Sequence, residues 1–313
     1  MHQGAHKTHW AIALCVLAFT LPGSKVAAQT AYKYRDANGQ WVYADRVNTP
    51  AAATGNSITL AREHEALHLD VERVETEHST QLVGVNDCLC VVTLRVSIMK
   101  SSIAEVPEGT NYEATLEPES RKALIEVKGG KGELRYSWTA ALGSPKAVHS
   151  PAHPYRAPFA LGETFLISQA YPMRFTHVTP DSQYAIDIAV PDGTPIYAAR
   201  EGTVINVRHD SFSGAPAPVM LDQANVVQIL HDDGTIAVYA HLHWDSIRVH
   251  IGQHVATGEY IANSGNTGFT TGAHLHFAVL RNSGNAEVSV PVQFAGVAGL
   301  PVTPATSMQL TAY

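Results

Sequence analysis

The chain has 313 residues, of which 45% are hydrophobic and 16% charged, a composition that supports a folded core. Its formal net charge is −7, so it is not expected to hold a phosphate backbone by charge, which argues against a nucleic-acid partner. The length suggests two domains, or one domain with appendages.

Residues 1–28 have the features of a signal peptide. Lys7 and several histidines precede an apolar run over residues 10–21, and residues 26–28 are small, as a cleavage site requires. The run is too short to span a bilayer, although an uncleaved anchor is the alternative. We therefore expect an exported protein, periplasmic or extracellular, with no membrane span in its mature form.

Residues 29–58 are predicted to form a short hairpin module followed by a linker. Asn38-Gly39 lies between aromatic, alternating flanks, which is a strong signal for a β-hairpin. Residues 47–58 are rich in Ala, Asn, Thr, Ser and Gly, as linkers are. The segment resembles a short N-terminal module found on many exported bacterial proteins.

Residues 59–140 are predicted to form a β-rich domain of unknown role. Its expected strands are Cys90 to Met99, Ala123 to Lys128 and Glu133 to Thr139. Residues 141–158 contain four prolines and are expected to be a linker to the last domain.

Two patterns in this domain contain residue types that can bind a metal or form a disulfide. His64-Glu-Ala-Leu-His68 matches a zinc motif that works only on a helix, but the alternation of residues 67–72 is that of a strand and favours a solvated charged face. Cys88 and Cys90 leave three states open, namely a strained disulfide, free thiols or an intermolecular bond.

Residues 159–313 show short strands and tight turns. The expected strands are Tyr184 to Ala189, Val204 to His209, Val226 to His231, Ile236 to Ala240 and Ala273 to Leu280. Strands of this spacing predict a mainly β fold, with an antiparallel sheet or barrel in this domain. In Ala273 to Leu280, His274 and His276 fall on the face opposite Leu275 and Phe277, so one imidazole can bind a metal while the other handles a proton.

Further motifs follow one another in this region: Asp187-Ile-Ala, Gly193-Thr-Pro195, His231-Asp-Asp-Gly234, Tyr239-Ala-His-Leu242, Ser264-Gly-Asn-Thr-Gly268, Thr271-Gly-Ala-His-Leu-His-Phe277 and Pro291-Val-Gln-Phe294. In this order they resemble the lysostaphin-type zinc endopeptidases of bacterial cell walls, whose catalytic domain is LytM-like. The resemblance implies a duplicated-hybrid-motif-like β fold and the hydrolysis of peptide cross-links in peptidoglycan.

The resemblance implies a Zn²⁺ ion held by His177, Asp187 and His276. The compact family spacing is His-x-x-x-Asp, but the residue four before Asp187 is Gln183. His177 is the nearest upstream histidine, and some relatives carry such a longer loop. The alternative is that His177 is a surface histidine and that the site is completed by His209, His231 or His243.

The resemblance also implies that His241 and His274 are catalytic. Zinc makes a bound water more acidic, and the two imidazoles would take its proton and stabilise the transition state. His243 is expected at most to support them, and Ser211 to Pro218 to form a groove wall that shapes specificity. The competing hypothesis is a non-catalytic wall-binding or amidase-regulating module of the same fold.

Overall fold

The computed structural model describes residues 67–103, 105–128, 132–173, 175–284 and 286–313 in full, and residues 30–35, 41–44 and 57–59 as strands. The chain divides into two compact units, 1–63 and 64–313. The predicted signal peptide lies outside the described residues. Within the described part of the chain, no helix has the length and apolar character needed to cross a membrane.

The first unit contains one small antiparallel sheet of order β2-β1-β3. Its strands are β1 (Thr30–Arg35), β2 (Trp41–Ala44) and β3 (Ser57–Thr59). Arg35 pairs with Trp41, as a hairpin around Asn38-Gly39 requires, although the turn itself lies outside the described residues.

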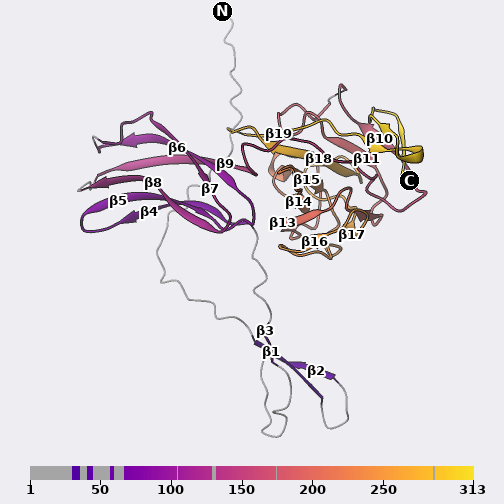
Figure 1. The fold of residues 1–313 in the computed structure, drawn as a ribbon, viewed down its shortest axis with the longest axis horizontal. Coiled ribbons are helices and arrows are strands. Elements are labelled where there is room, and N and C mark those ends of the chain that lie inside the picture. Colours follow the sequence, from indigo (N-terminus) through magenta and orange to yellow (C-terminus); the bar gives the residue numbers. More distant parts are fainter. Residues whose placement is uncertain are drawn as a thin grey trace, which may run out of the picture. The chain divides into compact units, whose positions relative to one another are not determined.

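The second unit begins with two three-stranded antiparallel sheets, of order β4-β5-β8 and β7-β6-β9 (Figure 1). The strands are β4 (Leu69–Glu75), β5 (Ser79–Asn86), β6 (Val92–Ser101), β7 (Asn111–Leu116), β8 (Ser120–Lys128) and β9 (Leu134–Leu142). Buried side chains from both sheets, including Leu82 and Leu94, form one apolar cluster, so the two sheets are a β-sandwich. A Cβ added to Gly84 would lie 2.8 Å from Leu94, so this glycine permits the close approach of the sheets.

The structure shows the surroundings of His68 and of the two cysteines, Cys88 and Cys90, in this sandwich. Leu69 begins β4, so the residues after His68 form a strand as expected, and His68 contacts the Asp87 carboxylate at 2.9 Å. His64 lies outside the described residues. Cys88 and Cys90 form a disulfide in the turn between β5 and β6, where their Cα atoms are 5.1 Å apart.

The rest of the unit is built on a nine-stranded antiparallel sheet of order β16-β13-β14-β15-β18-β11-β10-β22, with β19 paired to β18 (Figure 1). Its strands are β10 (Thr164–Gln169), β11 (Ile186–Ala189), β13 (Gly202–Arg208), β14 (Val226–Leu230), β15 (Ile236–Ala240), β16 (His254–Val255), β18 (Leu275–Asn282), β19 (Glu287–Ser289) and β22 (Gln309–Thr311). The mainly β class predicted from the sequence is confirmed.

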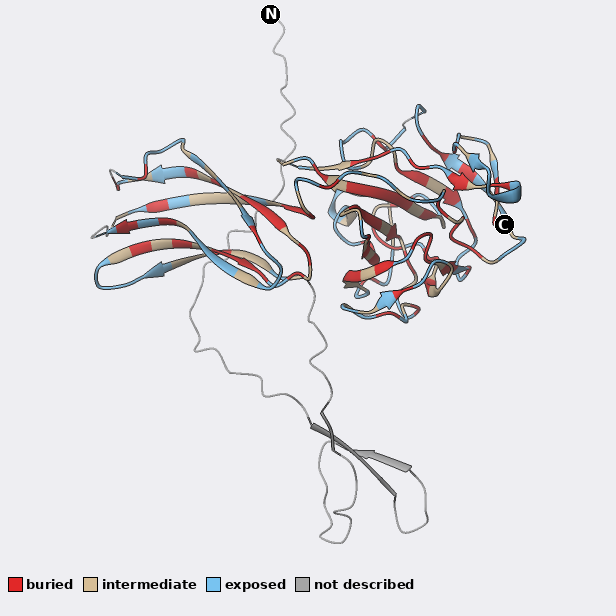
Figure 2. Ribbon diagram, in the orientation of Figure 1, coloured by how far each residue is buried: buried red, intermediate tan, exposed pale blue. Residues whose placement is uncertain are grey.

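Two two-stranded antiparallel sheets and two 3₁₀ turns complete the unit. They are β12 (Pro195–Tyr197) with β17 (Tyr260–Asn263), β20 (Phe294–Ala295) with β21 (Pro301–Val302), η1 (Pro218–Met220) and η2 (Val297–Gly299). One face of the large sheet packs on the main apolar core, in which Ile188, Tyr239 and Phe277 are fully buried. Figure 2 shows buried stretches along the strands of this sheet. The opposite face is more open and carries the polar side chains described below.

Hydrogen bonds join the sandwich to the large sheet. The Asn282 amide, at the end of β18, donates to Thr93 Oγ1 at 2.9 Å and to the carbonyls of Ala141 and Gly143. Glu287 accepts a hydrogen bond from the Leu142 amide at 2.8 Å, and burial raises the pKa of its carboxyl. The segment predicted as a linker, residues 141–158, begins with these contacts and packs against the fold, since its Tyr155 is only 1% exposed.

Candidate metal centre

Strand pairing places Asp187 directly opposite His276. In β11, Ile186 and Ile188 enter the core, so Asp187 between them faces the open side of the sheet. In β18, Leu275 and Phe277 do the same for His276. The register pairs Asp187 with His276, and His276 Nδ1 lies 2.9 Å from Asp187 Oδ1.

His177 reaches the same carboxylate from the loop between β10 and β11. Its Nε2 lies 3.1 Å from Asp187 Oδ2, and its ring centre is 5.0 Å from that of His276. The side chain is buried rather than a surface histidine, at 4% exposure. Its Nδ1 donates to the Ala185 carbonyl at 3.1 Å, because a carbonyl only accepts, and Nε2 is therefore the ring nitrogen that faces the carboxylate.

These three side chains have the chemistry and spacing of a zinc site. One donor atom from each lies within 4.8 Å of the other two. Ligands 2.0–2.1 Å from a tetrahedral zinc lie about 3.3 Å from one another, close to the two nitrogen–oxygen distances above. Two imidazoles and one carboxylate leave the fourth position open, as in catalytic zinc sites. The roles of His177, Asp187 and His276 as ligands stay a prediction, and the geometry fits it.

A residue that the sequence analysis missed supports the carboxylate. Gln169, at the end of β10, donates to Asp187 Oδ2 at 3.1 Å and to Thr176 Oγ1 at 2.9 Å. Its own Oε1 accepts from the backbone amides of Phe175 and Thr176. Gln169 therefore connects Asp187 to the loop that carries His177. No motif contains it, and only its pairing with Asp187 across β10 and β11 reveals it.

The electrostatics of the cluster favour an ionised carboxylate. Burial raises the pKa of Asp187, but hydrogen bonds from His177 and His276 outweigh burial and hold that pKa well below its usual range. A carboxylate that stays charged and has both oxygens oriented is ready to bind a cation.

His241 lies beside this cluster, immediately after β15, in a backbone conformation with φ of +63°. Its ring centre is 4.5 Å from that of His274 and 5.9 Å from that of His276. Its Nδ1 donates to the Thr267 carbonyl at 2.6 Å, which leaves Nε2 as an acceptor. Burial and the nearby imidazoles lower the pKa of His241 to about 3, so the ring is neutral at pH 7.

His274, just before β18, is oriented in the same way. Its Nδ1 donates to the Gly272 carbonyl at 2.8 Å, and its Nε2 lies 3.8 Å from Asp187 Oδ1. In both predicted catalytic histidines Nδ1 thus donates to a backbone carbonyl, and Nε2 is the nitrogen left to exchange a proton. The structure brings them to the cluster, while their catalytic roles stay a prediction.

The alternative ligands do not join the cluster. Among the described residues, the only group of histidine, cysteine and acidic side chains spaced to hold a metal is His177, Asp187 and His276. His231 is buried elsewhere and donates to the Glu201 carbonyl at 2.7 Å. His243 lies against Trp244 and lines a separate cavity of about 390 Å³ that Phe212, from the predicted groove wall, also lines.

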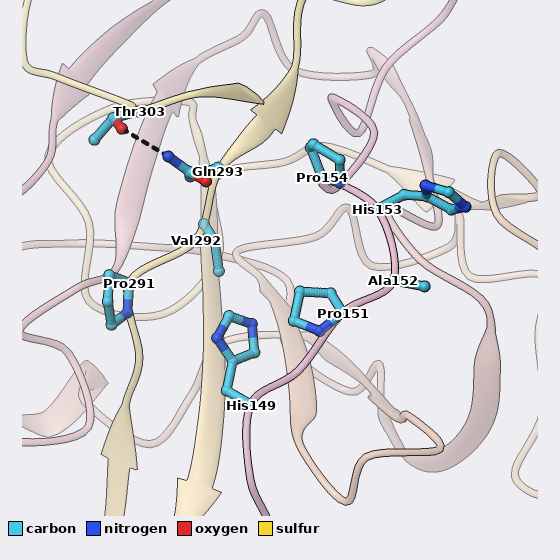
Figure 3. Close-up of a pocket in the computed structure, with 9 residues that line it drawn as sticks. All are labelled: His149, Pro151, Ala152, His153, Pro154, Pro291, Val292, Gln293 and Thr303. Carbon is cyan, nitrogen blue, oxygen red and sulfur yellow. Dashed lines mark hydrogen bonds between the residues drawn. The ribbon is translucent and has the colours of Figure 1, made fainter. Parts of the chain in front are cut away.

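Two further cavities have about the same size. One, of about 460 Å³, includes His241 and His276 in its lining and lies on the open face of the sheet. The other, of about 470 Å³, lies between the segment with His149 and His153 and the segment with Gln293 and Thr303 (Figure 3). None of the predicted site residues lines the second cavity, so only the first is a candidate substrate groove.

Comparisons with known proteins match parts of the chain. Residues 181–288 match the model of peptidase family M23, and residues 13–67 match a domain of unknown function, DUF4124. The chain is 37% identical over 94 residues to the peptidoglycan DD-endopeptidase ShyA of Vibrio cholerae, which covers 30% of this chain and 19% of ShyA. It is 29% identical over 127 residues to lysostaphin of Staphylococcus staphylolyticus, which covers 39% of this chain and 24% of lysostaphin.

A solved structure also aligns with the chain. It is the catalytic domain, in a mutant form, of the prophage-encoded M23 protein EnpA from Enterococcus faecalis, with 28% identity, a TM-score of 0.32, and coverage of 42% of this chain and 92% of that one. The chain spans about a fifth of ShyA and about a quarter of lysostaphin. His177 and Gln169 lie before the segment that the family model matches.

Proposed function

Residues 181–288 are a peptidase domain of family M23, and we propose that the chain is an exported zinc-dependent endopeptidase that hydrolyses peptide cross-links of bacterial peptidoglycan. The observation that carries the proposal is the cluster of His177, Asp187 and His276, with two further imidazoles beside it. The substrate class is inferred from relatives such as ShyA, whose name describes a peptidoglycan DD-endopeptidase.

Zinc would be held by His177 through Nε2, by the Asp187 carboxylate and by His276 through Nδ1, the nitrogen nearest that carboxylate. When bound, it would supply a Lewis acid that acidifies water and polarises the scissile carbonyl. Gln169 orients Asp187, and the Ala185 carbonyl orients His177, so the ligands are held in place before any metal binds.

His241 and His274 then move protons. Each ring has its Nδ1 hydrogen on a backbone carbonyl, so each can accept a proton only at Nε2. A ring that has accepted one becomes a cation, which can stabilise negative charge on the former carbonyl oxygen or give the proton to the leaving amine. Their rings are close enough to share this work.

The substrate peptide would lie in the 460 Å³ groove that His241 and His276 line. Val226, Ala240 and Ala278 give its floor small side chains, which leaves room for an extended chain above the sheet. The N-terminal segment supports export, because residues 1–28 have the composition of a signal peptide.

The proposal is tested by digesting purified peptidoglycan with the full chain. We expect about one zinc per chain by elemental analysis, release of new amino and carboxyl termini that mass spectrometry identifies, and loss of this release after chelation with recovery on adding zinc. Full hydrolysis by a metal-free preparation would contradict the proposal, as would a zinc-loaded protein that binds peptidoglycan without cleaving it.

A further inference from the structure

The groove beside the metal centre contains one basic side chain, Arg208, that no motif includes. Its lining is otherwise apolar, polar or acidic, and the acidic residues are Asp181, Asp222 and Glu287. Arg208 is the last residue of β13 and is half-buried. A guanidinium is always charged, so its position in a groove raises the question of what it binds.

The strand register places Arg208 in line with the metal centre. Arg208 pairs with Val226, Val226 with Ala240, and Ala240 with His276. Directly paired residues of an antiparallel sheet project from the same face, so Arg208 and His276 share the open face. Three strand spacings separate their Cα atoms by about 14 Å. A peptide that crosses the strands from the metal centre therefore reaches Arg208.

A backbone contact orients the Arg208 side chain. Its Nε donates to the Ala224 carbonyl at 2.8 Å. Ala224 precedes Val226 on the approach to β14 and lies near the end of the sheet where Leu242 bonds to Asn225, next to His241. The contact thus directs the guanidinium toward the catalytic end of the groove and leaves its two terminal nitrogens available as a fork.

No carboxylate of the described residues forms an ion pair with the Arg208 guanidinium. Among the described residues, the ion pairs of arginine and lysine involve Arg73, Arg95, Lys100, Arg121, Arg135 and Arg200, and none involves Arg208. Asp222 is exposed, and neither it nor Asp181 or Glu287 forms an ion pair with Arg208. A half-buried, oriented guanidinium with both terminal nitrogens available is suited to a planar anion from outside the chain.

We infer that Arg208 binds a free carboxylate of the substrate peptide, in a subsite one or two residues from the bond that is cut. The inference rests on the proposed function, because it assigns the carboxylate to the peptide being hydrolysed. Two extended residues span about 7 Å. The Arg208 side chain covers the remaining part of the distance of about 14 Å between the Cα atoms of Arg208 and His276. The groove would then select stems with an unmodified carboxylate over stems in which it is amidated.

The test uses the full chain loaded with zinc and a set of cross-linked stem peptides, in each of which one free carboxylate is replaced by a carboxamide. At one of the carboxylate positions of the peptide, we expect the carboxamide to raise the KM of the wild-type protein about tenfold, with kcat changed less than about twofold. Arg208→Gln raises the KM for the unmodified peptide to the same extent and no longer distinguishes the two forms. Arg208→Lys gives an intermediate effect, because an ammonium cannot make the bidentate contact.

Arg248→Gln is the matched control, since this exposed arginine lies outside the groove and should leave both KM values unchanged. Binding of the same peptides is measured by calorimetry alongside turnover. Cleavage of all forms with equal KM, or an equal loss for all forms in Arg208→Gln, would overturn the inference and leave the proposed function standing. Binding that distinguishes the forms through Arg208, without any cleavage, would support the inference and contradict the proposed function.

Discussion

Gln169 donates a hydrogen bond to the same oxygen of Asp187 that faces His177, at 3.1 Å. One side chain thus holds the carboxylate and, through Phe175 and Thr176, the start of the loop that brings His177. Partners of this kind orient metal ligands, and their removal typically weakens metal binding by about 10–100-fold.

We therefore predict that Gln169→Ala lowers the affinity for zinc by about 10–100-fold while the protein stays folded. Titration against a chelator of known affinity measures the change. Gln293→Ala is the matched control, because Gln293 lines the cavity in Figure 3 and contacts none of the predicted ligands. Equal zinc affinity in both variants would show that Gln169 does not position Asp187.

Replacing a predicted ligand should have a different result from replacing a predicted proton carrier. Asp187→Ala and His276→Ala are expected to lose bound zinc, and with it hydrolysis. His177→Ala, measured in the same way, tests the loop histidine. Elemental analysis of each purified variant gives the zinc content. Retention of one zinc per chain in His177→Ala would remove that residue from the ligand set.

His241→Ala and His274→Ala should keep most of the metal. Their kcat is expected to fall by about 10²–10⁴-fold, the usual contribution of general acid–base catalysis. Steady-state kinetics on a cross-linked stem peptide, with zinc content determined on the same samples, separates this outcome from metal loss. A variant that retains wild-type kcat has no proton-transfer role.

The stability of the protein should fall on mild acidification because of His231. Burial, countered in part by the hydrogen bond to Glu201, lowers the pKa of His231 from 6.5 to about 4. Between those pH values the unfolded chain takes up a proton that the folded chain does not, so the free energy of unfolding decreases as pH falls, by about 3 kcal/mol in total. Above pH 6.5 both states are neutral at this residue, and it contributes no slope.

Urea unfolding at several pH values measures this dependence. His231→Gln should remove the slope contributed by His231 between pH 6.5 and 4. His254→Gln, at an exposed position, is the matched control. Asp233 also has a lowered pKa, because burial is outweighed by its hydrogen bonds, the strongest of them from Arg200. The stability that the Asp233 carboxylate gives the folded state is therefore lost only below the ordinary pKa range of an aspartate. Identical slopes in the wild-type protein and His231→Gln would contradict the prediction.

Asn282 should contribute strongly to stability. It is fully buried, and its amide is the shared donor to Thr93, Ala141 and Gly143. Asn282→Ala removes these buried hydrogen bonds, and we expect the free energy of unfolding to fall by about 2–3 kcal/mol. The exposed Asn111→Ala should change it by less than about 0.5 kcal/mol. Similar urea midpoints for both variants would show that the hydrogen bonds from Asn282 to the sandwich are not important for folding.

The sequence predicted those parts of the fold that depend on local alternation. Ile186-Asp187-Ile188 and Leu275-His276-Phe277 each show a polar residue between two apolar ones, which fixes the face of both strands. The motifs then indicated which polar residues belong together. His177 could be predicted as a ligand only from the family spacing and the longer loop that some relatives carry, since no local pattern distinguishes it from other histidines.

Other features depend on long-range pairing and were not predicted. Gln169 and Arg208 acquire their positions from strand register, and irregularities in β10 and β13 shift that register by one residue. The positive φ of His241 and the disulfide between Cys88 and Cys90 arise at turns whose shape tertiary contacts decide. Asn282 looks like an ordinary polar residue in the sequence, because its acceptors lie more than 130 residues away.

β18 carries His276 near its start and Asn282 at its end. A truncation to residues 159–313 would therefore strip the cover from Asn282, Ile205 and Ile236, which pack with the sandwich. Such a fragment would expose apolar surface on β18, the strand that supplies a predicted ligand. A low yield of soluble fragment or a low zinc content would then reflect this exposed surface rather than the chemistry of the intact chain.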